Sequence, residues 1–357
     1  MKSDLELFKE YYLQVKKDLE KVIDDYNKEL LKNKEGYLKN NLEIFSNLNR
    51  DGKLIRGFLI SLGYKMSNKK NIDYSYPLAL AYEIFQTSIL IHDDIIDEDN
   101  LRRGKETIHY SCYKNNKKYN DTLAKKIGDS VAICVGNYGL FEAFKQIIKN
   151  YGNDKNYSKI LEYYDETILK TCEGELIDVE LSFDGRYKLK DTNLYDNIMS
   201  IYKLKTAYYT IIGPLTLGLI LGGISDDKLK IIEKLGEKIG IAFQIQDDIL
   251  GIYNDMGKVI GSDIKEYKQT LLFSYTMDKK EYKDELLKYY GKEDISEKEI
   301  EIVQSIFKES GAYDYAYGLM NDLYNESLEI IKDISWIDTN NKKLLIGFVE
   351  YLRQRNK

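Results

Sequence analysis

The sequence predicts an all-α protein, built as one bundle of ten or more helices. Proline, the residue least tolerated inside helices, occurs only twice in 357 residues. Helical periodicity recurs along the chain, with few strand signals. Because no internal repeat and no shift of composition marks a boundary, we expect a single domain over residues 1–357.

The chain begins with a charged, amphipathic stretch that lacks the apolar centre of a signal peptide. We therefore predict an N-terminal helical segment over residues 1–45. The three cysteines show no C-x-x-C pairing, which disfavours a disulfide framework or a zinc site and suits a reducing, cytoplasmic location. A formal net charge of -6 argues against a nucleic-acid partner.

Two long helices are predicted in the interior of the protein. Residues 77–98 start with proline at a plausible first helical position and carry an apolar face from Leu80 to Ile91. Residues 227–253 carry a second apolar stripe, from Ile232 to Gln246. Both stretches are long enough to cross a large helical bundle.

One apolar segment bears on whether the chain enters a membrane. Residues 207–224 are about as long as the ~18 apolar residues at which spanning becomes plausible. Pro214 and several glycines favour a buried central helix instead, so we expect no stable membrane insertion. Two polar stretches are predicted outside the helices: a polar loop or insertion at 111–126, and a second loop at 289–298.

An acidic cluster follows the first long helix, in LIHDDIIDEDNLRRG at residues 90–104. Asp93 and Asp97 are four residues apart, so on a helix they lie on one face, with Asp94 beside them. Carboxylates this close repel unless a cation lies among them, and their hard oxygens suit Mg²⁺ completed by substrate phosphates. The alternative is a solvated acidic helix end, but the apolar run before Asp93 favours a cavity.

A second acidic pair ends the other long helix, in AFQIQDDILG at residues 242–251. Asp247 and Asp248 again follow an apolar stretch, and Gln244 lies one turn before Asp247. If the two acidic clusters face one another, Mg²⁺ ions between them can hold a diphosphate. The metal then acts as a Lewis acid on the leaving group as a carbon–oxygen bond breaks.

With these motifs the sequence resembles the trans-isoprenyl diphosphate synthases, the polyprenyl synthetase family, and most of all its geranylgeranyl and farnesyl types. Three further segments carry the resemblance in the same order: GKLIRG at 52–57, KTAYYT at 205–210 and GKVIGSDIKEYKQTLL at 257–272. The resemblance implies antiparallel helices around a central cavity and a homodimer. It also implies a prenyltransferase that condenses an allylic diphosphate with isopentenyl diphosphate.

The resemblance assigns roles to the acidic and polar residues. Mg²⁺, three ions per active site, is expected on Asp93, Asp97 and Asp247. The neighbouring carboxylates Asp94 and Asp248 are expected to take part in catalysis. A hydroxyl and an amide dipole are expected near the carbocation, from Thr206 and Gln244.

The resemblance also assigns roles to basic residues. Contacts to the allylic diphosphate are expected from Arg102, Lys205 and Lys268. Isopentenyl diphosphate is expected on Lys53, Arg56, Arg103 and Gln86. Each basic residue has a plainer alternative, such as a solvated helix face for Lys53 and Arg56, or simple neutralisation of the acidic cluster for Arg102 and Arg103.

Five positions depart from the family pattern. Leu54 replaces a common basic residue and Gly57 a usual proline, from which we expect weaker binding of isopentenyl diphosphate. Gln86 replaces a frequent histidine but can also donate a hydrogen bond. Gly251 replaces a third carboxylate, as in many geranylgeranyl-type enzymes, and Glu175 replaces a usual glutamine.

The resemblance implies that the growing chain runs beside the helix of the first aspartate motif and that a bulky residue one turn before the motif stops it early. Ser88 and Ile89 occupy this turn without an aromatic plug, so a fifteen-carbon limit is not expected. Phe85 lies eight residues before Asp93, ~12 Å along a helix, a depth that suits a product of about twenty carbons. Phe85 as plain core and a longer polyprenyl product are the alternatives.

Two other function classes share part of this pattern. A class I terpene cyclase needs a hydroxyl residue in its second metal motif, where NDMGKVIGS at 254–262 has Lys258. A non-catalytic subunit that binds prenyl diphosphates is expected to have eroded aspartate clusters, and both clusters are largely present here. The prenyltransferase is therefore the favoured hypothesis.

Overall fold

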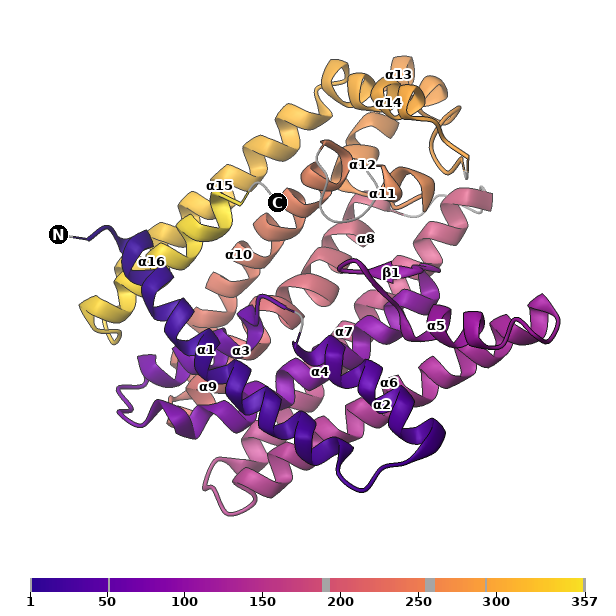
Figure 1. Ribbon diagram of the computed structural model, residues 1–357. Helices are drawn as coiled ribbons and strands as arrows, with labels where there is room; N and C mark the ends of the chain where they lie inside the picture. Colours follow the sequence, from indigo (N-terminus) through magenta and orange to yellow (C-terminus); the bar gives the residue numbers. More distant parts are fainter. Residues whose placement is uncertain (1, 51, 188–192, 254–260, 293, 356–357) are drawn as a thin grey trace. The chain divides into compact units, whose positions relative to one another are not determined.

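The structure, a computed structural model, describes residues 2–50, 52–187, 193–253, 261–292 and 294–355. Helices form almost all the regular structure in these ranges (Figure 1), and the only strands within them are β1 (Leu101–Arg102) and β2 (Lys105–Glu106), one antiparallel pair. The prediction of an all-α protein is confirmed. The chain divides into two compact units, each described by itself, and the single domain over 1–357 stays a prediction.

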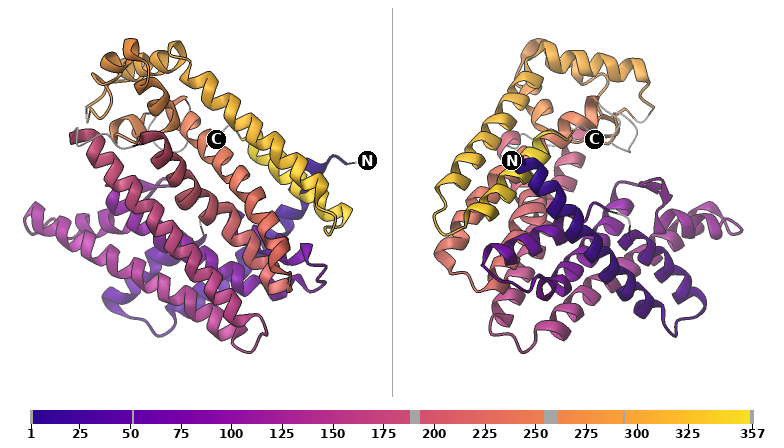
Figure 2. Two further views of the ribbon diagram at one scale, coloured as in Figure 1. Left: turned by 180° about the vertical axis from the view of Figure 1, so that it is seen from behind. Right: turned by 60° about the vertical axis from the view of Figure 1, so that its left-hand side comes forward.

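Unit 2 holds the first acidic motif and consists of residues 10–161 and 217–224. Its helix α4 is apolar on nearly every side and packs against α6 and α3. Figure 2 shows α4 and α6 running close together in further views. The elements of this part of the chain are α1 (Asp4–Leu31), α2 (Gly36–Arg50), α3 (Ile55–Met66), the 3-10 helix η1 (Ile72–Ser75), α4 (Tyr76–Ile96), α5 (Ile108–Asn115) and α6 (Asp121–Tyr151).

The end of α4 sets the position of the acidic motif. The helix was predicted over 77–98 and is observed at Tyr76–Ile96, with Pro77 in its first turn. Asp97 still bonds back to the Asp93 carbonyl at 2.8 Å, but Glu98 adopts a left-handed φ of 54° and stops the helix. Asp93 and Asp97 therefore lie one turn apart at the helix end, as predicted.

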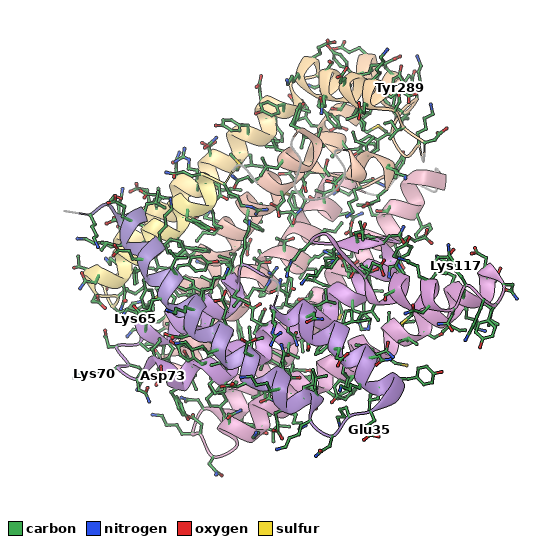
Figure 3. The ribbon with its side chains drawn as sticks, in the orientation of Figure 1. Glu35, Lys65, Lys70, Asp73, Lys117 and Tyr289 are labelled. Carbon is green, nitrogen blue, oxygen red and sulfur yellow. The ribbon has the colours of Figure 1, made fainter. Side chains whose placement is uncertain are left out.

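The prediction of a polar loop or insertion at 111–126 is wrong. Helix α5 continues to Asn115 and α6 begins at Asp121, so only residues 116–120 connect them. Asn120 caps α6 by accepting a hydrogen bond from the Leu123 N–H at 2.8 Å. Lys117 projects outward from this connection (Figure 3). The polar residues mark a short turn and solvated helix faces, which sequence polarity alone does not distinguish from a loop.

Unit 1 holds the second acidic motif and consists of residues 1–9, 162–216 and 225–357. The helix predicted at 227–253 is confirmed as α10, which packs against η2 and α15 (Figure 1). The predicted 289–298 loop is confirmed for 289–292 and 294–296, since α13 ends at Leu286, but residues 297 and 298 already belong to α14, which begins at Glu297. The elements that belong to this unit wholly or in part are α7 (Tyr157–Tyr187), α8 (Leu194–Ile201), the π-helix η2 (Tyr202–Ile212), α9 (Gly213–Gly222), α10 (Asp226–Tyr253), α11 (Ser262–Lys265), α12 (Leu271–Met277), α13 (Lys280–Leu286), α14 (Glu297–Glu309), α15 (Ala312–Asp333) and α16 (Thr339–Arg353).

Of the apolar segment at 207–224, residues 207–222 belong to a continuous helical stretch, Leu194–Gly222. Among the described residues it is the one helix long and apolar enough to cross a membrane, and 83% of its most apolar window is buried within the chain. This burial matches the prediction of a core helix. Its middle part, η2, has the wider π-helical turn that is common at functional sites.

Candidate active site

The acidic end of α4 is organised around one arginine. Arg102, on β1, donates its Nε–H to Oδ1 of Asp94. Its Nη2 lies 3.2 Å from Asp93 Oδ2 and 3.5 Å from Asp99 Oδ2. Asp94 is 1% exposed, whereas the Asp93 side chain is 20% exposed. The aspartate pair thus directs one carboxylate into the protein and leaves the other accessible.

Burial controls the electrostatics of this cluster. It raises the pKa of Asp94 to about 6, although the Arg102 guanidinium acts in the opposite direction. Burial also lowers the pKa of Arg102, but the Asp94 and Asp93 carboxylates outweigh it and the net shift is upward. The Oδ2 oxygen of Asp94 is buried without a hydrogen-bond partner. An oxygen of this kind is available to a metal ion or to metal-bound water.

A second group in unit 2 brings together the side chains expected to bind isopentenyl diphosphate. In the amide orientation that satisfies both neighbours, Gln86 accepts from Arg56 Nη1 and donates to Glu83 Oε2, each at 2.9 Å. The guanidinium of Arg103 packs against Gly52, where a Cβ would lie 3.2 Å from its Nη1. The charges of Arg56 and Arg103 both act on Glu83, the hydrogen-bond partner of Gln86, so the three side chains lie around one carboxylate; Lys53, next to Gly52, is exposed.

Glu83 is a residue that the sequence did not mark. It is 5% exposed, and its Oε1 accepts a 2.7 Å hydrogen bond from the Gly57 N–H. Burial raises the pKa of Glu83, while this hydrogen bond and the charges of Arg56 and Arg103 act against the rise. Proline has no N–H to donate, so glycine at position 57 supplies a bond that the usual residue cannot make.

In unit 1 the second acidic motif is built differently. Asp248 is 5% exposed and both its oxygens accept hydrogen bonds: Oδ2 from the Tyr202 hydroxyl and Oδ1 from Gln244 Nε2 at 2.7 Å. Gln244 Oε1 in turn accepts from the Thr206 hydroxyl at 2.6 Å. Burial raises the pKa of Asp248 well above its usual value, despite the two donors. The sequence predicted the three polar residues of this site but not Tyr202.

Lys205 lies between two carboxylates of α7. Its Nζ is 2.8 Å from Glu175 Oε2 and 2.6 Å from Asp178 Oδ2. Two glycines permit the close packing of helices here. A Cβ at Gly174 would lie 2.4 Å from the backbone nitrogen of Lys205, and a Cβ at Gly240 would lie 2.4 Å from the Ala207 Cα. The glutamate at 175 therefore adds a negative charge directly at Lys205.

Asp247, the partly exposed aspartate of the second motif, is contacted by the C-terminal segment. Asp247 Oδ1 pairs with Arg355 Nη2 at 2.8 Å, and the Arg355 guanidinium stacks 4.8 Å from the centre of the Phe243 ring. The carboxylate of Asp263 approaches Gly251, where a Cβ would lie 2.8 Å from its Oδ2. Asp263 thus supplies a carboxylate near the position where the motif itself lacks one.

Lys268 is present in unit 1 but is engaged locally. Its Nζ lies 3.0 Å from Glu266 Oε2. The preceding part of the same motif, including Lys258, lies outside the described residues. A role for Lys268 toward the allylic diphosphate stays a prediction.

The carboxylates fit Mg²⁺ by their chemistry. Within the described ranges, no three His, Cys, Asp or Glu side chains converge as a closed metal cage. Mg²⁺ is normally held by one or two carboxylates, with water and substrate phosphate completing its shell. The partly exposed Asp93 and Asp247, and the buried Asp94 oxygen that has no hydrogen-bond partner, provide hard oxygen donors of this kind.

The three chain-length candidates are placed differently on α4. Phe85 is fully buried and stacks edge-on with Tyr82, ring centres 5.4 Å apart. Ser88 is also buried and faces Gly139 of α6, where a Cβ would lie 2.1 Å from its Oγ. Ile89 is only half-buried. Of the three candidates, Ile89 is therefore the one that is not fully buried.

Comparison with known proteins places these features in one family. The polyprenyl synthetase family model matches residues 39–308. Geranylgeranyl diphosphate synthase of Sulfolobus acidocaldarius is 29% identical over 86% of this chain and 88% of its own length. A short chain isoprenyl diphosphate synthase of Methanothermobacter thermautotrophicus is 32% identical over 72% of this chain and 74% of its own length.

The fold agrees with these sequence matches. The structure is similar to a crystal structure of geranylgeranyl pyrophosphate synthase from Corynebacterium glutamicum, complexed with isoprenyl diphosphate and magnesium. The TM-score is 0.85 at 23% identity, over 97% of this chain and 98% of that chain. This similarity confirms the predicted isoprenoid-synthase fold. Since the matching family model covers well over half of the sequence, the chain belongs to the polyprenyl synthetase family.

Proposed function

We propose that this prenyltransferase condenses an allylic diphosphate with isopentenyl diphosphate and releases geranylgeranyl diphosphate. The proposal rests above all on one observation, made in each unit separately. Each aspartate pair combines a buried, anchored carboxylate with a partly exposed one that pairs with an arginine. The relatives named as geranylgeranyl diphosphate synthases support the same reaction and product.

Divalent metal belongs to this reaction. We assign Mg²⁺, three ions per active site, to the carboxylates of Asp93, Asp97 and Asp247. The buried carboxylates of Asp94 and Asp248 hold the neighbouring side chains in place through their hydrogen bonds. Bound Mg²⁺ would act as a Lewis acid on the departing diphosphate. The ligand assignment and the number of ions are parts of the proposal.

Each of the two substrates is bound by its own set of basic side chains. Arg102, Lys205 and Lys268 bind the allylic diphosphate. The cluster of Lys53, Arg56, Arg103 and Gln86 binds the diphosphate of isopentenyl diphosphate, because guanidinium groups fit phosphate oxygens in a bidentate manner. Arg56 is already oriented for this role by Gln86.

The reaction then needs no covalent enzyme intermediate. The allylic carbon–oxygen bond breaks and its electron pair leaves with the diphosphate. Thr206 and Gln244 direct their dipoles at the resulting cation, and the double bond of isopentenyl diphosphate attacks it. The adduct loses a proton, for which the released pyrophosphate is the base. An apolar environment protects the cation from water.

Product length depends on the side of α4 where the chain grows. Ile89 and Phe85 set the depth available to a twenty-carbon product, whereas Ser88 acts mainly in helix packing. We expect Ile89→Phe to shorten the product toward fifteen carbons and to preserve folding. Ser88→Phe would collide with α6 and should lower the thermal unfolding temperature instead.

We also propose a cytoplasmic homodimer. Several apolar side chains are exposed along α6, among them Phe141 at 75%, and α7 exposes Leu169, Leu176 and Phe183 at seven-residue steps. Unpaired thiols at all three cysteines suit a reducing compartment. Sedimentation of the native chain against Phe141→Lys tests the dimer, since the added charge should shift it toward monomer.

One assay separates the candidate functions. Purified protein is incubated with Mg²⁺, isopentenyl diphosphate and dimethylallyl, geranyl or farnesyl diphosphate, and the prenyl chains are sized. Twenty-carbon diphosphate is the expected product, and longer diphosphates would assign a longer-chain synthase. Hydrocarbon without diphosphate would indicate a cyclase, and binding without turnover a non-catalytic subunit.

A further inference from the structure

A directional series of hydrogen bonds links a backbone amide to Thr206 through Tyr202. The Leu271 N–H donates to the Tyr202 hydroxyl oxygen at 2.9 Å, and a backbone N–H can only donate. The single hydroxyl proton of Tyr202 is therefore directed to Asp248 Oδ2. All the atoms involved belong to unit 1, and Tyr202 is 3% exposed.

The series continues with its direction fixed. Gln244 donates its amide nitrogen to the other Asp248 oxygen, so its own carbonyl oxygen is presented to Thr206. The Thr206 hydroxyl must then donate its proton to Gln244. Its lone pairs remain as the negative end of the hydroxyl dipole.

This orientation matters for a cation. If the Gln244 amide were reversed, Thr206 would accept from the amide nitrogen and its hydroxyl proton would be free to turn toward the substrate. The positive end of the dipole would then approach a developing positive charge, which is unfavourable at short range. In the structure the Gln244 amide nitrogen donates to Asp248 Oδ1 at 2.7 Å while Tyr202 occupies Oδ2, and this pair of bonds holds Gln244 in the favourable orientation.

We propose that Tyr202 is a positioning residue that, through Asp248 and Gln244, fixes the Thr206 hydroxyl with its oxygen lone pairs toward the allylic cation. The proposal rests on the proposed function, since it needs Thr206 near the reacting carbon. Tyr202 itself touches no substrate. Its effect falls on the chemical step and not on substrate or metal binding.

The test compares two buried tyrosines. Tyr202→Phe removes only the hydroxyl, and we expect the single-turnover rate of condensation to fall about tenfold. Half-saturating Mg²⁺ and the Kd of the allylic diphosphate should stay within about twofold of wild type. Tyr151→Phe is the matched control: the Tyr151 hydroxyl also accepts a backbone N–H, from Leu78 at 3.2 Å, and donates to the Tyr74 carbonyl in unit 2.

Two results would overturn the proposal. In the first, Tyr202→Phe and Tyr151→Phe show equal rates. In the second, the rate losses caused by Tyr202→Phe and by Thr206→Val multiply in the double variant. If Tyr202 acts through Thr206, the double variant should instead have the same rate as Thr206→Val alone. If Tyr202→Phe does not fold, Asp248→Asn probes the same orientation, because its amide permits Gln244 to reverse. Wild-type protein without condensation activity would instead refute the proposed function.

Discussion

The two aspartate pairs resemble one another in geometry and differ in how the buried carboxylate is stabilised. In each pair the second residue, Asp94 or Asp248, is buried and the first, Asp93 or Asp247, is partly exposed. Neighbouring residues on a helix point about 100° apart, so an aspartate pair at the edge of a core divides in this way. One carboxylate of each pair therefore stays partly accessible, while the other is held by hydrogen bonds inside the protein.

The two buried carboxylates, Asp94 and Asp248, are held by different kinds of partner. Asp94 is met by a buried guanidinium, a full opposite charge. Asp248 is met by a tyrosine hydroxyl and an amide, which carry no net charge. The first arrangement pairs the buried carboxylate with an opposite charge, whereas the second surrounds it with neutral donors, and burial raises the pKa of Asp248 well above its usual value.

The largest effect is expected from the exposed aspartates. Asp93→Ala should lower turnover by about 10³-fold or more, because metal-assisted stabilisation of the leaving diphosphate is lost. Far-ultraviolet circular dichroism should be unchanged, since Asp93 is not part of the core. Asp247→Ala should behave in the same way.

Combining the two variants sharpens this comparison. If both carboxylates act on one diphosphate, the double variant should be little worse than either single one, as for residues that act as a unit. Fully multiplicative losses would mean that the two pairs act on separate steps. Activity near wild type in Asp93→Ala would remove it from the metal site.

The sequence predicted the positions of the helices better than the side-chain contacts between them. The helices at 76–96 and 226–253 follow from apolar periodicity, a proline start and the absence of breakers, which are local properties. Polarity misled at 111–126, because a five-residue turn between two helices and a long loop have similar composition. The acidic motifs were found because four-residue spacing fixes a shared helix face.

The anchoring partners were not predictable in the same way. Tyr202 lies 46 residues from Asp248, and Glu83 lies 26 residues from Gly57. Nothing in the spacing of either pair indicates contact, because the contact is made by helices packing together. A buried glutamate in the apolar α4 was the one available signal for Glu83, since an unpaired charge is rarely placed in a core.

The pH dependence of stability tests the ionic anchor. Burial raises the pKa of Asp94 from 3.8 to about 6 in the folded state. A raised pKa means that the protonated form favours folding, so this contribution is complete below about pH 4 and is lost as the pH rises through about 6. In metal-free buffer, the unfolding free energy of wild type should fall relative to Asp94→Asn by up to about 3 kcal/mol across this range.

Denaturant titrations of both proteins over that range provide the measurement. If the difference in unfolding free energy between wild type and Asp94→Asn stays constant with pH, Arg102 holds Asp94 ionised throughout. The two buried aspartates, Asp94 and Asp248, would then differ more strongly in pKa. Chelator must be present in both series, because bound metal would itself stabilise the ionised form.

Glu83 extends the comparison to a carboxylate anchored by a backbone N–H. Gly57→Pro removes that donor and should lower the unfolding free energy by about 1–3 kcal/mol, the cost of an unsatisfied buried group. Glu83 would then compete for Arg56, raising the KM for isopentenyl diphosphate. Gly57→Ala is the control, because it keeps the N–H and adds only a methyl group 3.1 Å from Glu83 Oε1.

Steady-state kinetics with varied isopentenyl diphosphate distinguish the two variants. A higher KM in Gly57→Pro but not in Gly57→Ala would assign the effect to the lost hydrogen bond. Equal changes in both would assign it to crowding against Glu83 and Leu19.

The smallest effect is expected at Lys205, where a lysine meets two carboxylates. Glu175→Gln keeps a hydrogen-bond acceptor and removes one of the two negative charges, so Lys205 should attract the allylic diphosphate more strongly. Because the side chains are about a quarter exposed, solvent screens the change, and we expect the KM for the allylic substrate to fall only about threefold. The matched control is Glu237→Gln, which removes the partner of Lys203 at 2.9 Å. Lys203 is more exposed and has no predicted role, so its variant should leave the KM unchanged; a fall of similar size there would mean that net charge alone, and not Lys205, sets the affinity.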